Sequence, residues 1–494
     1  MKNPDIKLQQ HEKLPGKKQI DASEHWVMFF SSTEKMGEVA YADSLMKRRT
    51  QLGRKTFDSE PVEIDLANAL GSHVVYACID EEITQFDLLT LARKMIAAQE
   101  KHKVDRLGIA ICGFGSAQGE GVAEAIIAAA CAAAAVMPSY KSDKKSRSGM
   151  RRLDLHGLKA KHGFKRTFAE AEGNALARYL SILPPNELTP GNYTQRIRKL
   201  ARENKWKFEF YDNKALQKKK AGAFLAVVQG SVEKDGGIVR LQYTPRTTSS
   251  RGKVVLVGKG ICYDTGGTNL KPAKNMFGMH EDMQGSAVAL GTFLALTQMQ
   301  VNFPLECWLA LAINHIGPKA YKPNDVITAS DGTTIEIVHT DAEGRMVLAD
   351  TLALASRQKP KLIIDYATLT GACVYSIGNS YSGIFTNREQ LHPSLIQAGK
   401  DSGERVWPFP LDKDYDKGLD SDIADIKQCA LEGEADHILA ARFLQRFVKN
   451  DTPWVHLDLS SSNRKGGLAH IPTDTTGFGV RFTLNLLLDK KVHH

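Results

Sequence analysis

The chain has 494 residues, of which 42% are hydrophobic and 24% charged, and its net charge at pH 7 is +9. The composition is that of an ordinary globular protein, and the length exceeds what one hydrophobic core usually holds, so we expect two domains. No run of about 18 or more apolar residues occurs, which argues against a membrane-spanning helix.

Targeting and cysteine signals both favour a cytoplasmic protein. The start of the chain, MKNPDIKLQQHEKLPGKK, is polar and basic and lacks the apolar segment of a secretory signal. The seven cysteines are dispersed through apolar segments and form no Cys-x-x-Cys pair. We therefore expect buried free thiols in a reducing compartment.

One segment holds nearly all of the excess charge. Between Lys141 and Thr167 the sequence has ten lysines and arginines and two aspartates, a net charge of +8. A solvated surface loop is the favoured interpretation. The alternative is a patch that binds nucleic acid, although no interleaved aromatic residues or zinc-finger spacing support it.

The first part of the chain alternates predicted strands and helices. His73–Ile79 and Arg106–Cys112 are short apolar runs typical of buried strands. Glu120–Met137 is alanine-rich and too long for a strand, which indicates a buried helix. Thr167–Leu183 has helical periodicity and stops at two prolines, which cannot continue a helix.

We place the domain boundary at this last helix. Residues 1–166 are expected to form an N-terminal α/β domain, 167–190 a connecting helix and linker, and 191–494 a C-terminal domain.

The second part begins with a predicted helix at Thr189, with Pro190 in its first turn. Three predicted strands then run directly into polar loops: Lys253–Val257, Thr334–Thr340 and Lys361–Tyr366. Helical segments such as MVLADTLALAS separate them, which predicts a mainly parallel sheet covered by helices on both faces. In such sheets ligands bind at the carboxyl ends of the strands, where all three polar clusters fall.

The loop after the second of these strands places two carboxylates close together. If the segment stays extended, Asp341 and Glu343 point the same way and repel each other unless a cation lies between them. Ala342 and Gly344 leave room for a metal ion. The plainer interpretation is a helix-start acid beside a surface arginine, Arg345.

The loop after the first strand adds Lys259, Asp264 and Lys271 among several glycines. A phosphate-binding loop is disfavoured, because the spacings GxxxxGK[ST] and GxGxxG are both absent. Asp264 suits a divalent cation, whereas Lys259 is either a ligand in its neutral form or a counter-ion. Glu281 and Asp282 lie near a predicted helix start, where capping alone could explain them.

These motifs together resemble the leucyl aminopeptidase family, also called cytosol aminopeptidases. The family signature Asn-Thr-Asp-Ala-Glu-Gly-Arg-Leu corresponds here to HTDAEGRM, and the segments VGKG, DTGG, KP, DMQG, ATLTGA and TTGFGVR occur in the family's order and spacing. The similarity covers about Leu183 to Leu488 and the linker LPPNELTP, whereas the first part is similar only in general character.

The resemblance implies a catalytic metallopeptidase domain with two divalent ions, zinc or manganese. The metal ligands of the family correspond to Lys259, Asp264, Asp282, Asp341 and Glu343. Its two further catalytic residues correspond to Lys271 and Arg345. The pocket for the first substrate side chain corresponds to Met279, Thr368 and Gly371, and the Leu369 backbone to the group that holds the substrate carbonyl.

The activity implied is removal of the N-terminal residue from short peptides with a free N-terminus. Two metal ions share and activate a water, Lys271 stabilises the developing oxyanion, and Arg345 holds a bicarbonate that acts as general base. The resemblance also implies a homohexamer whose active sites face an inner cavity.

The sequence departs from the family pattern at three places. His339 replaces asparagine, which we interpret as a substitution that keeps a supporting hydrogen bond, with a new titrating role as the alternative. Met346 replaces leucine and is expected to pack in the core.

The third departure is a cluster of polar residues where the family has small ones, just before an AARFL helix: Glu432, Glu434, Asp436 and His437. One interpretation is an exposed loop, and the other is altered specificity that favours basic or polar N-terminal residues.

A second function remains an alternative to the peptidase: DNA binding or regulation through the basic segment 141–167. A degenerate relative without activity is disfavoured because every ligand type is present. A dimetal phosphatase is disfavoured because the conspicuous motifs supply carboxylates and lysines instead of histidines.

Overall fold

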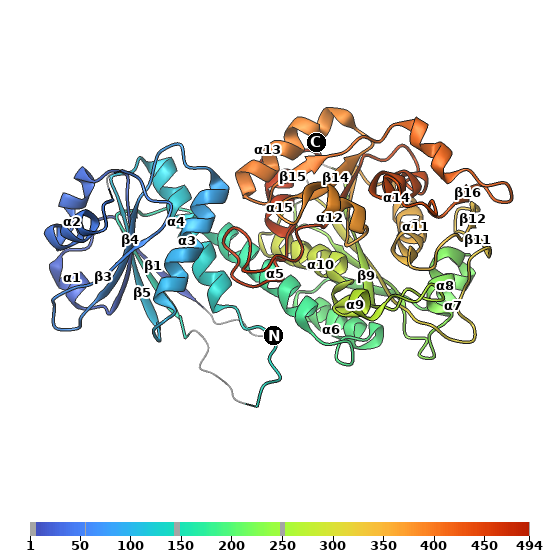
Figure 1. Ribbon diagram of the computed structural model, residues 1–494, viewed down its shortest axis with the longest axis horizontal. Helices are drawn as coiled ribbons and strands as arrows, with labels where there is room; N and C mark the ends of the chain where they lie inside the picture. The colour runs from blue at the N-terminus through green and yellow to red at the C-terminus, as the bar shows by residue number, and fades with distance from the viewer. Residues whose placement is uncertain (1–5, 55, 143–148, 248–251, 494) are drawn as a thin grey trace. The chain divides into compact units, whose positions relative to one another are not determined.

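The computed structural model describes residues 6–54, 56–142, 149–247 and 252–493 (Figure 1). The chain divides into two compact units. Unit 1 comprises Met1–Ala175, Lys400–Gly403 and Lys465–Thr476, and unit 2 comprises Leu176–Gly399, Glu404–Arg464 and Gly477–His494. Both units contain a mostly parallel sheet flanked by helices, which confirms the predicted α/β class.

Unit 1 has a six-stranded sheet in the order β1-β6-β5-β2-β4-β3, parallel except for β3. Its strands are β1 (Lys7–His11), β2 (His25–Phe30), β3 (Val62–Asp65), β4 (His73–Cys78), β5 (Arg106–Cys112) and β6 (Arg152–His156). Its helical segments are α1 (Lys17–Asp21), η1 (Glu34–Glu38), α2 (Ala42–Gln51), α3 (Gln85–Gln99) and α4 (Ser116–Ala134). The predicted strands at residues 73–79 and 106–112 and the alanine-rich helix are thus confirmed.

Strands β2 and β4 are buried along their whole length because both sheet faces are covered. Side chains of α3 and α4 form one core with alternate strand residues such as Val27 and Val75. The opposite face packs against α1, η1 and α2 through Trp26, Met28 and Tyr76. This double coverage explains why these strands are continuous apolar runs in the sequence.

The basic segment lies partly in this sheet. Residues 143–148 lie outside the described residues. In β6, Arg152 Nε donates to the buried Asp154 carboxylate at 3.0 Å, and Arg106 pairs with the same carboxylate. Nucleic-acid binding by this segment stays a prediction.

Helix α5 (Lys165–Ile182) crosses the division between the two units, which falls between Ala175 and Leu176. Helix α6 (Pro190–Glu203) follows, and the Thr189 hydroxyl accepts a hydrogen bond from the Asn192 N–H at 3.2 Å. This capping confirms the predicted helix start at Thr189.

Unit 2 is built on an eight-stranded sheet in the order β15-β14-β17-β13-β9-β10-β8-β7, of which β17, β13, β9 and β10 are mutually parallel. The strands are β7 (Lys207–Tyr211), β8 (Gly237–Tyr243), β9 (Val254–Asp264), β10 (Leu305–Asn314), β13 (Leu362–Ala367), β14 (Ser382–Thr386), β15 (Val406–Pro408) and β17 (Trp454–Asp458). A separate small sheet contains β11 (Val326–Thr328), β12 (Thr334–Glu336) and β16 (Ile426–Lys427).

Helices cover both faces of the eight-stranded sheet. The remaining helical segments are α7 (Asn213–Lys218), α8 (Gly222–Val228), α9 (Ala273–Met276), η2 (Met279–Glu281), α10 (Gln284–Gln298), α11 (Glu343–Ser356), α12 (Gly371–Ile377), η3 (Glu389–Leu391), α13 (His392–Ser402), η4 (Lys413–Leu419), α14 (Asp436–Arg446) and α15 (Val480–Leu488). None of the helices in the described ranges is long and apolar enough to span a bilayer.

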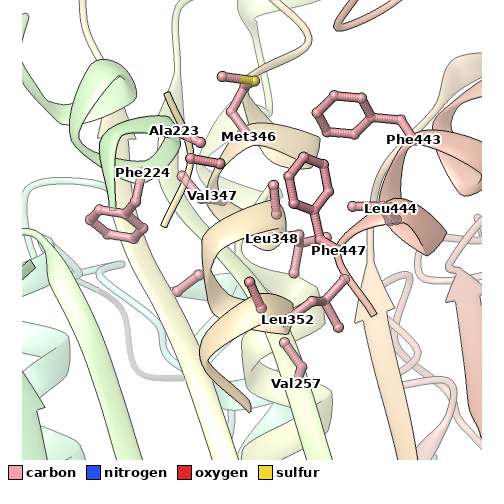
Figure 2. Close-up of a cluster of buried hydrophobic side chains, with 14 of the residues drawn as sticks. Ala223, Phe224, Val257, Met346, Val347, Leu348, Leu352, Phe443, Leu444 and Phe447 are labelled. Atoms are coloured by element: carbon pink, nitrogen blue, oxygen red, sulfur yellow. The ribbon is translucent and has the colours of Figure 1, made fainter. Parts of the chain in front are cut away.

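Helix α11 is the centre of the core on one face. Leu348 and Leu352 lie between Val257 of β9 and Phe447, which directly follows α14 (Figure 2). Met346 is fully buried in the same cluster, which confirms its expected place in the core.

One expectation about the sheet is wrong. The segment 334–340 was expected to be a strand of the main parallel sheet, but only Thr334–Glu336 is a strand, β12, and it belongs to the small sheet. Ile335 and Ile337 alternate because both pack into the core around α11. The residues that follow form a turn that leads into α11, so the strand ends there.

Helix α10 lies directly on the other face of the sheet, and glycines at the crossing make this possible. A Cβ on Gly285 of α10 would lie 2.1 Å from the Tyr366 carbonyl oxygen of β13. A Cβ on Gly258 of β9 would lie 2.5 Å from Ser286 Cα. Because both obstacles are backbone atoms, neither contact can be relieved by a side-chain rotation.

We therefore expect Gly285→Ala to lower the free energy of unfolding by about 1–3 kcal/mol, since α10 must move off the sheet. The matched control is Gly121→Ala in α4, where a Cβ would meet nothing within 4 Å. The control is expected to gain up to about 1 kcal/mol from helix propensity. Urea unfolding of both variants measures the difference, and equal midpoints would contradict the close crossing.

Candidate active site

The site lies where four parallel strands of unit 2 end. Asp264 ends β9, Asn314 ends β10 and Asp458 ends β17, while Thr368 directly follows β13. Parallel strands present their carboxyl ends at one edge of the sheet, so these polar residues converge. The predicted junctions after Lys253–Val257 and Lys361–Tyr366 contribute as expected, and β9 continues to Asp264.

Lys259 reaches the site from within β9. Residues alternate between the two faces of a strand, and Lys259 shares the α11 side with Val257. Gly344 of α11 faces it, and a Cβ there would lie 2.7 Å from Lys259 Nζ. The ammonium lies 2.7 Å from Asp282 Oδ1, 3.3 Å from Glu343 Oε1 and 2.8 Å from the Thr368 carbonyl oxygen.

Three carboxylates form a compact cluster beside this lysine. One oxygen each of Asp264, Asp341 and Glu343 lies within 4.8 Å of the others. Lys271 Nζ lies 2.8 Å from Asp264 Oδ2 and 2.5 Å from Asp341 Oδ1. Two lysines therefore face four acids, counting Asp282 on the other side of Lys259, and can balance the charge of only two of them.

The proximity of Asp341 and Glu343 has a different cause from the predicted one. The segment is not extended: the Ala342 N–H donates to the His339 carbonyl at 3.1 Å in a turn, and Glu343 is the first residue of α11. Glu343 thus lies at the helix N-terminus, where the partial positive charge stabilises a carboxylate. Asp282 likewise precedes its helix, α10, instead of lying within it.

Burial and mutual repulsion make these carboxylates hard to ionise. Burial raises the pKa of Asp282 and of Asp341 to about 6 each, and the neighbouring Asp264 carboxylate adds to both shifts. Burial also raises the pKa of Glu343 well above its ordinary value. Burial alone would lower the pKa values of Lys259 and Lys271, but the surrounding acids raise both above the ordinary value. The cluster as a whole needs more positive charge than two ammonium groups supply.

The donor set fits divalent metal ions. Asp282 Oδ2 is buried and accepts no hydrogen bond from any described residue, so it is available as a ligand. Carboxylate oxygens at one sheet edge suit zinc, manganese or magnesium, and a lysine amine becomes a ligand once it loses its proton. The residues that could hold metal are Lys259, Asp264, Asp282, Asp341 and Glu343.

Two residues that hold this arrangement in place were missed in the sequence. Asn314 is fully buried, and its Nδ2 donates to Asp264 Oδ1 at 2.8 Å and to the Thr340 carbonyl at 3.0 Å. Asp458 accepts from the Leu369 N–H at 3.1 Å and from the Thr370 hydroxyl at 2.7 Å. Each is the last residue of an apolar strand, LECWLALAIN or WVHLD, so a polar residue at a strand end was the available signal.

Arg345 is buried in the same region, with its side chain 3% exposed. Its Nη2 donates to Asp436 Oδ1 at 2.7 Å and its Nη1 to the Gln428 carbonyl at 3.1 Å. Its Nε is buried without a partner among the described residues. The guanidinium therefore already holds one anion, the Asp436 carboxylate.

A cavity of about 820 Å³ joins the cluster to the surface. Its lining includes all eleven residues predicted for the site: Lys259, Asp264, Lys271, Met279, Asp282, Asp341, Glu343, Arg345, Thr368, Leu369 and Gly371. Phe277 and Tyr375 also line it, with more than nine-tenths of each side chain exposed. The Leu369 N–H is already engaged by Asp458, so a substrate carbonyl would share that donor.

His339 lines the cavity and supports the turn before α11. Its Nδ1 accepts a hydrogen bond from the Asp341 N–H at 3.3 Å. Burial, aided by the nearby Lys271 charge, lowers the pKa of its imidazole. An asparagine oxygen could accept the same bond, which agrees with the supporting role predicted from the sequence.

We expect Asn314→Ala to weaken metal binding about 10- to 100-fold, because Asp264 loses the donor that orients it. Calorimetric titration of the metal-stripped protein with zinc or manganese measures this. Asn379→Ala is the matched control: Asn379 lines the same cavity, is exposed, and makes no side-chain hydrogen bond among the described residues. Equal affinities in the two variants would contradict the orienting role.

Comparison with known proteins places these features in a family. A sequence model described as "Cytosol aminopeptidase family, catalytic domain" matches residues 175–484. A protein titled "Probable cytosol aminopeptidase" from Wolbachia pipientis is 42% identical over 335 residues, 67% of this chain and 66% of that protein. One of the same title from a Polaromonas species is 38% identical over 403 residues, 81% and 78% of the two chains.

A similar fold is also known from a solved structure. A tomato leucine aminopeptidase mutant superposes with a TM-score of 0.86 over 99% of this chain and 97% of that chain, at 24% sequence identity. At this identity the likeness concerns the fold.

Proposed function

Because this chain belongs to the cytosol aminopeptidase family and is an aminopeptidase, a metal-dependent hydrolase, we propose that it removes the N-terminal residue from short peptides with a water activated by two metal ions. The observation that carries the proposal is the largely buried cluster of four acids and two lysines at the carboxyl ends of the parallel strands. Apolar residues of similar volume would stabilise the fold as well as these charges do, so the charges indicate a functional site.

The two ions would be held by Lys259, Asp264, Asp282, Asp341 and Glu343. When bound, they would lower the pKa of a shared water and polarise the scissile carbonyl. Their charge would also relieve the repulsion that raises the pKa values of Asp282, Asp341 and Glu343. With that charge in place, Lys259 can release its proton and coordinate through the neutral amine.

Lys271 and Arg345 take the two further catalytic roles in this proposal. Lys271 is partly exposed to the cavity and lies on the Asp264 and Asp341 carboxylates, from where its ammonium can stabilise an oxyanion. Arg345 holds the anion that accepts the water proton. The resemblance makes this anion bicarbonate, although Asp436 lies on the same guanidinium.

Substrate binding completes the proposal. Met279, Thr368 and Gly371 would contact the first side chain, and the Leu369 backbone the substrate carbonyl. A free α-amine would complete the metal coordination, which explains why only N-terminal residues are removed. We extend the proposal to zinc or manganese as the metal, a homohexameric assembly and a cytoplasmic location, all of which rest on the resemblance.

The central test is hydrolysis of aminoacyl-arylamides by metal-stripped protein. We expect no activity without metal and recovery when zinc, manganese or cobalt is restored, because the water needs the ions for its activation. An N-acetylated substrate should resist cleavage in every condition. Absence of activity with all three metals would refute the proposed function.

The role of His339 is tested separately. Because burial lowers its pKa, the imidazole is neutral throughout the range above its ordinary value of about 6.5. We therefore expect His339→Asn to leave the shape of the pH–rate profile unchanged. A displaced acidic limb in the variant would instead assign a titrating role to His339.

A further inference from the structure

The Arg345–Asp436 ion pair is a feature that the proposed function does not use. Asp436 Oδ1 lies 2.7 Å from Arg345 Nη2 inside the site cavity, and the two side chains are 27% and 3% exposed. The arginine is thus fully enclosed, and its carboxylate partner faces the open space.

Asp436 is the first residue of α14, where an acid interacts favourably with the positive end of the helix dipole. The capping position before it is Ala435, which adopts a left-handed conformation with φ 49° and has no side chain that could cap the helix. The turn directs the side chain toward Arg345, and Oδ2 accepts no hydrogen bond from the residues that the structure describes.

From this geometry we propose that Asp436 is the resident anion of Arg345 and takes the place of a bound bicarbonate. The inference rests on the proposed function, in which Arg345 holds the proton-accepting anion. Two observations disfavour a second anion on Arg345. Nη2 and Nη1 already donate to the Asp436 carboxylate and the Gln428 carbonyl, and the Asp436 charge repels another anion at the same guanidinium.

The proton balance of the reaction is then closed within the chain. Water loses one proton to the free Asp436 Oδ2 as its oxygen bonds to the scissile carbonyl carbon. When the peptide C–N bond breaks, that proton passes to the leaving nitrogen, which departs as an amine, and Asp436 returns to its ionised form. No co-reactant is consumed, and bicarbonate is unnecessary.

The experiment compares aminoacyl-arylamide hydrolysis in carbon-dioxide-free buffer with and without added bicarbonate. For the wild type we expect the same kcat/KM in both conditions. Asp436→Gly should lose about 100-fold without bicarbonate, the scale of a missing general base, and regain at least about tenfold when bicarbonate fills the vacated position. Asp436→Asn should lose activity without rescue, because the amide fills the position but carries no charge.

Glu434→Gly is the matched control, since it removes an exposed carboxylate two residues away that does not line the cavity. It should behave like the wild type in both buffers. This comparison separates the loss of the Arg345 partner from a general change of the loop.

A second readout does not depend on catalysis. Bicarbonate should raise the thermal midpoint of Asp436→Gly with increasing concentration, because it binds the folded state, and should leave the wild type unchanged.

Activation of the wild type by bicarbonate, or full activity of Asp436→Gly without it, would overturn the inference. If no protein is active with any metal, the proposed function fails, and the thermal readout still decides the inference. If Asp436→Gly does not fold, the response of the wild type and of Asp436→Asn decides it.

Discussion

The structure of unit 2 depends on one electrostatic constraint: four acids, three of them buried, must be held together at one edge of a sheet. Burying a carboxylate is costly unless opposite charge and hydrogen bonds surround it. Lys259 and Lys271 supply the charge, while Asn314 and the start of α11 supply dipoles. The parallel strands bring these groups to one edge of the sheet. The helices on both faces, and the glycines where α10 crosses the strands, bring them within hydrogen-bonding distance of one another.

Two glycines make room for close contacts that any side chain would block. Gly344 makes room for the Lys259 amine, and Gly285 lets α10 lie on β13, so that the Asp282 segment reaches the same edge. A larger residue at either place would separate the acids from the lysines. Each buried charge would then lack its partner, which destabilises the folded state. The apolar core around α11 in Figure 2 fixes the helix whose first residue is Glu343, which links ordinary packing to the position of a candidate ligand.

Much of this could be predicted from the sequence, and the failures have physical causes. The α/β class follows from apolar strands that alternate with helices, and the residues of the site from polar clusters at strand ends. The strand at 334–340 was misplaced because alternation shows a buried face without showing which sheet it joins. The Asp341–Glu343 geometry was misjudged because the turn at His339 is fixed by a backbone hydrogen bond that no pattern of residue types reveals. Asn314 was missed, and Asp436 was interpreted only as part of a polar loop or specificity cluster, because their partners lie 50 and 91 residues away in the chain.

The lysine contacts have a consequence for how the protein matures. In a small zinc-binding domain the ion supplies the folding energy, and the metal-free chain is unfolded. Here Lys271 bridges Asp264 and Asp341, and Lys259 bridges Asp282 and Glu343, so the acids are already held together by the chain itself. Under the proposed function, the fold would therefore form without the metal ions. Coordination by Lys259 would require its ammonium group to release a proton to solvent.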